Sequence, residues 1–438
     1  ATSAIYTDTV AGMTNTSIDK DDSSKHNAVV NVNAVSNNKI ISTADGLTVS
    51  AGTGTLELGA AAAVSKVTSN ADTKAEISGG KQNVKSELVK AASDAKITDV
   101  AAALSAGVGS GMVGASGTAN VAINNIHNDV TAKIKNNAVV NAYDSLGVLA
   151  ESSDTLRNYG GAVSVGVSAK AGVALGATVV VNKIDGNTEA SIDGSSVSAK
   201  GNGDSISVKE YEPSTETAGT DKELSSVGIN EKTVDKKGLV VNADAKHTLN
   251  DISVTAGVGT STFAGVGFNA TVINNTIGGN TKAEITKTDV NKTLAGLTDN
   301  SNVSVQSNDR LDVSSHAGTL SVGAGGAGGV SAAGAVDVNN FNRTTVADIT
   351  GKAAADRNTV NANATSVKAL GSTKLLVTES GLSAGAGLKV GIGAIGVVSK
   401  NNFTNNTAAS MSNVDGQQNN VNIDADSVKL LRSYTNAA

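Results

Sequence analysis

The stretch VSVGVSAKAGVALGATVVVNKIDGNTEASI, residues 163–192, contains the two patterns that decide the fold. In its first part, the odd positions from Val163 to Val181 are all apolar, and several even positions between them are Ser, Gly, Lys or Thr. A period of two is typical of a β-strand, because successive side chains of a strand point to opposite faces. Its last part, T-E-A-S-I, is one copy of a motif that recurs along the chain.

The recurring motif is T-x-A-x-[I/M], and its closing aliphatic residues are separated by 59, 57, 58, 93, 64 and 62 residues. Self-similarity at a near-constant interval is the mark of a stacked repeat architecture. We therefore expect one repetitive structure over residues 1–438, with units that end near residues 18, 77, 134, 192, 285, 349 and 411. Five units also place an Asn ten residues before the closing aliphatic. The residues expected to maintain the repeat are Thr73, Ala75, Ile77, Asn124, Ala132, Ile134, Asn182, Thr188, Ala190, Ile192, Asn275, Thr281, Ala283, Ile285, Asn339, Thr345, Ala347, Ile349, Asn401, Thr407, Ala409 and Met411.

These patterns predict an all-β fold, a parallel β-helix (β-solenoid) built from repeats of about 60 residues. A run of 19 alternating residues exceeds an ordinary strand, so we expect short strands joined at corners with the odd residues facing inward throughout. A unit of this length would make about three coils, and the chain a rod of roughly 20 coils, on the order of 100 Å long. Gly and Asn suit the corners, and stacked Asn side chains can form ladders.

The composition excludes several classes of protein. The chain has 1 Pro, no Cys, no Trp and only 2% aromatic residues, which leaves little bulk for a thick core. Hydrophobic residues make up 39% and charged residues 17%, the reverse of a disordered chain. The net charge is −6 with both signs mixed, so nucleic acid is a poor candidate partner. No apolar run is long enough for a membrane-spanning helix, and we expect no direct membrane insertion of this segment.

A search for chemistry predicts no catalytic residue, no cofactor and no metal site. The four His residues, at positions 26, 127, 247 and 316, have unlike flanking sequences and are expected to be solvated loop residues. Asp19, Asp21 and Asp22 could offer oxygen ligands to calcium, but the Gly and ligand order of known calcium loops is absent. The Gly-rich run 323–329 lacks the Lys-Ser/Thr of a phosphate loop, so we interpret its glycines as close sheet packing. A β-helical carbohydrate-active enzyme is the less favoured alternative, since its site would need clustered acids and aromatic platforms.

One unit is about 30 residues longer than the others, and the excess fits a charged insertion at residues 209–238 that contains the one proline. Insertions in solenoids leave the stack as loops, often on one face. We interpret it either as a partner-binding loop or as a tolerated surface insertion. The candidate binding residues are Glu210, Pro213, Glu216, Asp221 and Lys236.

Both ends of the chain fall within a repeat. Residues 1–18 resemble the end of a unit, and residues 421–438 resemble the start of the next. We expect either a segment of a longer array or ends that join neighbours in an assembly, because uncapped sheet edges invite pairing.

The Ala/Gly/Val run followed by V-x-N and N-T-x-A-x-I resembles the repeats of bacterial surface proteins exported by type V secretion. These are the autotransporter passengers and filamentous adhesins, and the leukotoxin-like filamentous adhesin repeat is the best match. Residues 163–192 are the clearest copy, followed by 256–285, 322–349 and 383–411. The resemblance implies a β-helical passenger, an extracellular or cell-surface location, and a non-catalytic role in adhesion or aggregation. Its partners would be host or bacterial surface molecules, or further copies of itself.

Two structural alternatives stay open at this point. The run from Gly323 to Gly334 has almost no charge on either alternating face and could pack against a second sheet, which suggests a self-assembling extracellular filament subunit. A trimeric fibrous adhesin is the other alternative, but such chains carry coiled-coil heptads, and none is seen here.

Overall fold

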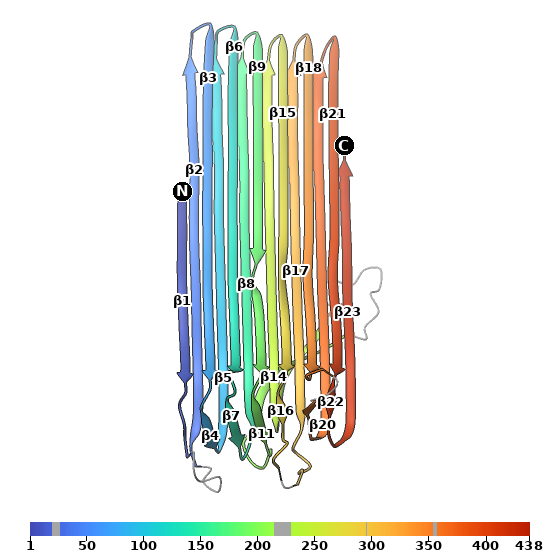
Figure 1. Cartoon of the computed structure of the whole chain (residues 1–438). Helices are drawn as coiled ribbons and strands as arrows, with labels where there is room; N and C mark the ends of the chain where they lie inside the picture. The colour runs from blue at the N-terminus through green and yellow to red at the C-terminus, as the bar shows by residue number, and fades with distance from the viewer. Residues whose placement is uncertain (20–26, 214–228, 295, 354–356) are drawn as a thin grey trace.

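The chain forms long parallel strands that alternate between two broad sheets, sheet A and sheet C (Figure 1). The computed structural model describes residues 1–19, 27–213, 229–294, 296–353 and 357–438, and these ranges contain no helix. Strands such as β3 and β6 are 23 residues long, so each extends over about 75 Å. The strands of sheet C are β2 (Val29–Gly52), β5 (Ser86–Gly109), β8 (Leu146–Ser168), β14 (Leu239–Ser261), β17 (Val303–Gly325), β20 (Ala362–Gly387) and β23 (Gln418–Ala437). The strands of sheet A are β1 (Thr2–Thr14), β3 (Leu56–Ser78), β6 (Val113–Lys135), β9 (Ala171–Asp185), β10 (Asn187–Asp193), β15 (Ala264–Thr286), β18 (Gly328–Thr350) and β21 (Val390–Ser412).

Each coil has two long sides and one short side. At one end of the molecule, called here the turn end, a strand of sheet C turns directly into a strand of sheet A. At the opposite end, the short-strand end, the chain passes through short strands before it returns to sheet C (Figure 1). The short strands are β4 (Lys81–Val84), β7 (Val139–Ala142), β11 (Ser196–Ala199), β16 (Asp289–Val290), β19 (Asn358–Thr359) and β22 (Val414–Asp415). The first four form sheet B, and a bridge between Val290 and Val360 leads on to the pair β19–β22. The fold is therefore a parallel β-helix, as the sequence predicts.

The prediction of about three coils per unit is wrong, because one unit makes one coil. Ile134 pairs with Ile77 on one side and with Ile192 on the other, which shows that neighbouring strands lie one full repeat apart. Sheet C contains seven strands, so the stack is only about 30 Å deep at about 4.8 Å per coil. The alternating run crosses one turn and contains no other corner. It continues as strand on both sides of the single turn near Lys170, since each long strand is supported along its length by in-register neighbours.

The first copy of the motif lies at a different position from the one predicted. Thr9, Ala11 and Met13 pair with Thr73, Ala75 and Ile77 of the next coil, so the first unit ends at Met13 rather than at Ile18. Ile18 lies beyond strand β1 and forms an isolated bridge with Gln82.

Sheets A and C approach most closely at the turn end. A Cβ atom added to Gly166 would lie 2.0 Å from the carbonyl oxygen of Val173 in the facing sheet. The same is true of Gly323 and the carbonyl oxygen of Val330, also at 2.0 Å. Near the turn end, the inward-facing positions are therefore restricted to Gly and to the small residues Ser and Ala. Farther from the turn the inner residues become larger, and fully buried Leu and Ile side chains such as Leu156 fill the interior.

The close approach reverses the predicted orientation of the alternating run. The odd residues from Val163 to Val181 face outward, and their even neighbours face inward. Val163 is 41% exposed, whereas Ser164 is fully buried. Larger aliphatic side chains cannot fit between backbones at this separation, so they line the outer faces of both sheets.

A ladder of asparagines crosses the interior at mid-height of sheet A. The side-chain amide of each Asn donates to, or accepts from, its counterpart one coil away, at 3.1 Å for the first pair and 2.9 Å for the next three. The ladder consists of Asn124, Asn182, Asn275, Asn339 and Asn401. Each amide has both a donor and an acceptor, so every Asn can bond to the Asn of the coil before it and to that of the coil after it. The ladder can therefore continue through any number of coils.

Residues with positive φ gather at the short-strand end rather than within the Gly/Ala/Val runs. Asn136 and Asn137, with φ of 60° and 57°, link sheet A to sheet B in one coil, and Gly194 with φ of 56° follows sheet A in the next. Asn and Gly tolerate this left-handed conformation, so they form the corners of the coil.

Substitution of Gly166 by Ala tests the close approach of the sheets. The added methyl group meets the carbonyl of Val173, and we expect a loss of about 1–3 kcal/mol of stability from overpacking. Gly117→Ala is the matched control, because a Cβ atom there meets nothing within 4 Å. The control should unfold at the same or a slightly higher temperature, since Ala restricts the unfolded chain more than Gly. Thermal unfolding followed by circular dichroism measures both, and equal midpoints for the two variants would contradict the assigned packing.

Candidate functional site

The motif residues predicted from the repeat lie in the core, except that those of the last unit, Asn401, Thr407, Ala409 and Met411, are only partly buried. Thr73, Ala75 and Ile77 are all fully buried, and the equivalent Thr, Ala and Ile residues of the following units up to Ile349 are buried as well. The Ala and Ile side chains pack at the short-strand end against aliphatic residues of sheet B such as Val84 and Val140. These residues maintain the coil and present no group to a ligand.

The three described histidines, His127, His247 and His316, lie on different strands and do not come together. His127, on the outer face of β6, lies between Asp185 and Asp129, with distances from Nδ1 of 2.8 Å and from Nε2 of 3.2 Å. Burial alone would lower the pKa of His127, but the hydrogen bond to Asp185 and the charge of Asp129 outweigh burial and raise the pKa. His247 is buried, and its Nδ1 lies 2.7 Å from Asp154. The expectation of solvated loop histidines is therefore wrong for both residues, which belong to strands; His26 lies outside the described residues.

Within the described ranges, no three His, Cys, Asp or Glu residues come together in a way that could hold a metal ion. Of the acidic cluster near the start of the chain, only Asp19 belongs to the described residues.

The insertion forms an antiparallel hairpin where the structure describes it. Strands β12 (Ile206–Pro213) and β13 (Ile229–Lys236) pair with each other, and Ile206 and Val208 pack against Leu149 and Val240 of sheet C. Of the predicted binding residues, Glu210 and Lys236 face each other in an ion pair of 2.8 Å, while Pro213 ends β12. Glu216 and Asp221 lie outside the described residues. The base of the hairpin is thus docked on sheet C, and its charges are paired with each other.

The broadest exposed feature is the outer face of sheet A near the turn end. It consists of five rows of outward side chains on β3, β6, β9, β15, β18 and β21, and we call it the apolar face. The rows, counted from the turn end and written in strand order, are row 1 (Leu56, Val113, Ala171, Ala264, Gly328, Val390), row 2 (Leu58, Ala115, Val173, Val266, Val330, Ile392), row 3 (Ala60, Gly117, Leu175, Phe268, Ala332, Ala394), row 4 (Ala62, Ala119, Ala177, Ala270, Gly334, Gly396) and row 5 (Val64, Val121, Val179, Val272, Val336, Val398). None of these residues carries a polar side chain. Because rows lie about 6.6 Å apart along the strands, the face is about 26 Å tall.

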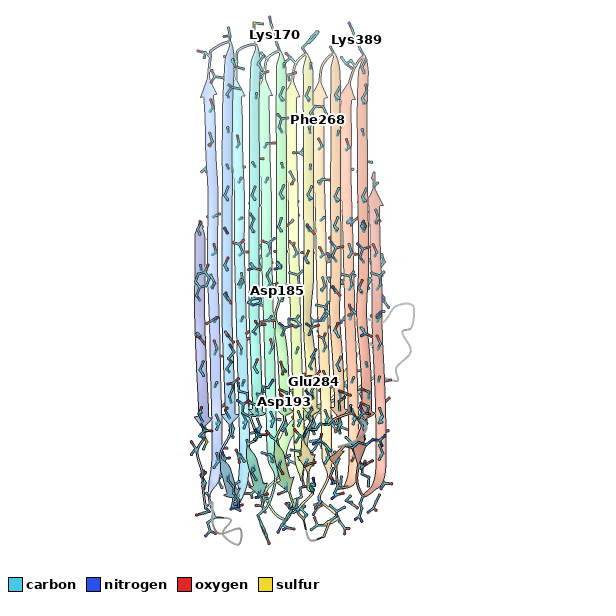
Figure 2. The ribbon with its side chains drawn as sticks, viewed as in Figure 1. Lys170, Asp185, Asp193, Phe268, Glu284 and Lys389 are labelled. Atoms are coloured by element: carbon cyan, nitrogen blue, oxygen red, sulfur yellow. The ribbon has the colours of Figure 1, made fainter. Side chains whose placement is uncertain are left out.

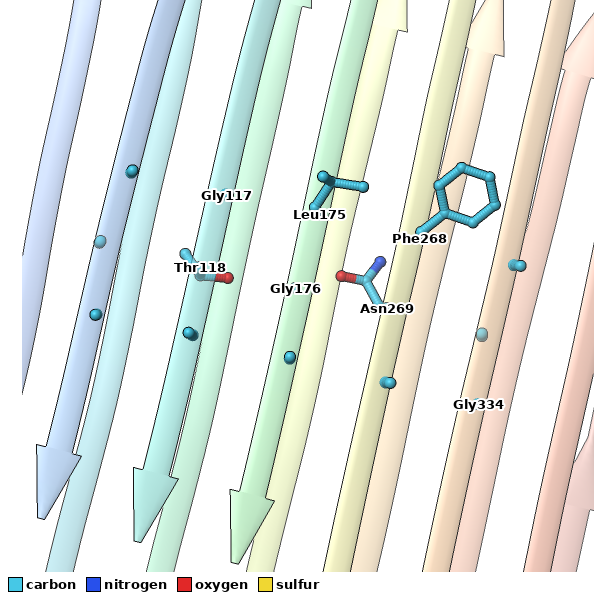
Figure 3. Close-up of a pocket in the computed structure, with 15 residues that line it drawn as sticks. Gly117, Thr118, Leu175, Gly176, Phe268, Asn269 and Gly334 are labelled. Carbon is cyan, nitrogen blue, oxygen red and sulfur yellow. The ribbon is translucent and has the colours of Figure 1, made fainter.

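A groove of about 850 Å³ crosses the apolar face along rows 3 and 4 (Figure 3). Row 4 contains only Ala and Gly and forms the floor, while the unbroken valine row 5 stands along one side. Leu175 and Phe268 project from the middle of row 3 and are 47% and 44% exposed. Contiguous exposed apolar surface of this extent is rare on soluble proteins and marks contact sites.

The same sheet is charged toward the short-strand end. Figure 2 shows Asp185, Glu284 and Asp193 in this half, where long polar side chains are dense, whereas short side chains dominate near Phe268. Ion pairs between neighbouring coils include Lys135 with Glu76, at 2.8 Å. At the turn end itself, Lys170 and Lys389 occupy the turns. The apolar face is therefore bounded by charge toward the short-strand end, whereas at the turn end Lys170 and Lys389 lie among exposed apolar turn residues such as Phe263 and Leu388.

The sequence already contains the signal for the apolar face, but the interpretation assigned it to the wrong side. Because apolar residues are usually buried, the alternation from Val163 to Val181 predicts an inward face, and this prediction is wrong. The residues between them, Gly, Ser and Ala, are the ones small enough for a narrow interior. The size of the intervening residues, rather than the hydrophobicity of the alternating ones, identifies the inside.

No protein-family model, no curated protein and no solved structure matches this chain. Among the described residues, the structure holds no helix that is long and apolar enough to cross a membrane.

Buried carboxylates accompany the asparagine ladder. Asp251 of sheet C accepts hydrogen bonds from Asn158 at 2.9 Å, from Asn182 at 2.8 Å and from Ser253 at 3.0 Å. Burial still dominates and raises the pKa of Asp251 to about 7. Burial likewise raises the pKa of Asp337 to about 6 and that of Glu379 to about 7. The equivalent of Asp251 in the preceding coil is Asn158, so an uncharged amide is compatible with this position.

These raised pKa values predict that the protein is most stable in mild acid. Between about pH 4 and pH 7 the folded state keeps protons that the unfolded state has lost, so stability falls as pH rises through this window. For Asp251 the loss amounts to at most about 4 kcal/mol. Asp251→Asn should flatten the dependence of the unfolding midpoint on pH, whereas the exposed control Asp45→Asn should leave it unchanged. An unaltered slope in the Asp251 variant would show that this carboxylate does not titrate in the window.

Proposed function

We propose that this chain is a non-catalytic structural segment of a bacterial cell-surface or secreted adhesin, which acts by presenting the apolar face to other surfaces. The scaffold is a rigid parallel β-helix, and every strand of the apolar face is held in register by its neighbours. The single observation that carries the proposal is this uncharged face of five rows on an otherwise polar sheet.

The repeat pattern supports an extracellular location, because it resembles that of type V secreted passengers. The partners would be host or bacterial surface molecules, or further copies of the chain. The pairing of Glu210 with Lys236 argues against the base of the insertion as the contact site, since these charges neutralise each other.

Beads coated with the purified chain should retain bacterial or epithelial cells, and the double variant Leu175→Ser/Phe268→Ser should retain far fewer. We expect at least about a tenfold loss, because burying one Leu or Phe side chain contributes about 1.5–3 kcal/mol. Retained cells are counted by microscopy after washing.

The matched control is Lys183→Ser/Lys282→Ser, which alters two exposed residues of the same sheet outside the apolar face. It should retain cells as the natural sequence does. Retention no greater than that of albumin-coated beads would refute an adhesive role. Release of reducing sugar from a panel of glycans would refute the non-catalytic assignment.

A further inference from the structure

We propose that the apolar face of sheet A is an interface between two copies of this chain, which pack face to face with their strands antiparallel. The inference rests on the proposed function for its role in aggregation, and it names the partner of the face. Three observations support the inference: the shape of the apolar face, its extent, and its presence on only one of the two sheets.

The two outer faces of the molecule differ in a way that points to a one-sided contact. On sheet A all five rows are apolar, over about 26 Å. On sheet C only the first three rows are largely apolar, and the fourth contains the exposed Asp45 and Ser380. A bilayer core about 30 Å thick would submerge those polar groups and others below them. The hairpin β12–β13 also covers part of sheet C, so sheet A is the broad face free for a flat contact.

The apolar face is complementary to itself. A two-fold axis that lies between the two copies, perpendicular to the strands and between rows 3 and 4, places row 3 of each copy over row 4 of the other. Phe268 then lies over Ala270 of the second copy, and Leu175 lies over Ala177. The two projecting side chains thus enter the groove whose floor is Ala and Gly. Such an isologous contact is what two-fold symmetry requires, because the same patch serves both partners.

The remaining rows fit the same arrangement. Row 2 lies over the valines of row 5, so aliphatic side chains meet aliphatic side chains. Row 1 lies over the next outward row of the partner, which is mixed and carries lysines on the two strands that border the apolar face. These are Lys66 on β3 and Lys400 on β21, so the charges fall at the rim of the interface and the centre stays apolar.

The area is sufficient for a stable dimer. Six rows of about 6.6 Å spacing and six strands of about 4.8 Å spacing cover roughly 800–1,000 Å² on each copy. Specific protein–protein interfaces bury about 800 Å² per partner, so the contact reaches the usual size.

Analytical ultracentrifugation of the full chain over a range of concentrations tests the proposal. The natural sequence should form dimers in the micromolar range, and Leu175→Lys/Phe268→Lys should weaken dimerisation at least tenfold. The matched control Leu104→Lys/Val254→Lys places the same charges on similarly exposed residues of the outer face of sheet C, and it should dimerise normally. A natural chain that stays monomeric at 100 micromolar, or a control that dissociates equally, overturns the proposal.

The orientation can be tested separately because the chain has no cysteine. In an equimolar mixture of Phe268→Cys and Ala270→Cys proteins, oxidation should yield mainly the mixed disulfide. Homodisulfides in excess would overturn the arrangement in which row 3 lies over row 4, because Phe268 would then face its own counterpart. Co-flotation of the natural chain with phosphatidylcholine–phosphatidylglycerol vesicles, lost in the Leu175→Lys/Phe268→Lys variant, would show instead that the face binds lipid.

The dimer and the adhesive function can fail separately. Cell retention by a strictly monomeric chain would overturn the dimer and leave the adhesive function intact. Dimers that retain no cells would overturn the adhesive function and leave the dimer intact.

Discussion

The separation of sheets A and C at the turn end determines which side chains can be used on either side of them. Backbones that leave no room for a methyl group at Gly166 or Gly323 require Gly, Ser or Ala inside. Successive side chains of a strand point to opposite faces, so large side chains that do not fit on the inner face can occur only on the outer face. The valines and leucines therefore lie on the outer faces because the interior between the sheets is too narrow for them. The narrow interior also explains why the chain has few aromatic residues.

Much of the architecture could be predicted from the sequence, because the repeat carries it. The interval between Ile134 and Ile192 specifies which residues pair across coils, and the recurring Asn at 124 and 182 specifies a ladder. The number of coils per unit could not be read in this way, since alternation does not reveal whether a strand continues or turns a corner. Strand length here depends on support from the in-register neighbours on either side of each strand, which is a property of the stack. The position of the first motif copy at Met13 was missed because Thr16 and Ile18 offered a similar pattern.

The candidate site was harder to predict than the fold. A face built from Ala, Val and Gly has no distinctive residue, and its meaning depends on which side of the strand it occupies. Leu175 and Phe268 become notable only when strands β9 and β15 are placed side by side, 93 residues apart in sequence. Conversely, the charged insertion attracted attention in the sequence, yet its described part is docked on sheet C through Ile206 and Val208. The uncovered face of sheet A is the surface on which both the proposed adhesive function and the proposed dimer depend.

Pairing of each strand with its counterpart one repeat away has a consequence for how the molecule acquires its structure. Nearly every hydrogen bond between coils joins residues 56–64 positions apart, or 93 at the insertion. The first coil therefore pays the entropic cost of closing a long loop before a second coil is present to pair with it. Once a coil exists, its edge is a template on which the next can form at much lower entropic cost. Assembly of the stack should therefore begin slowly and then propagate from coil to neighbouring coil, as a one-dimensional growth process.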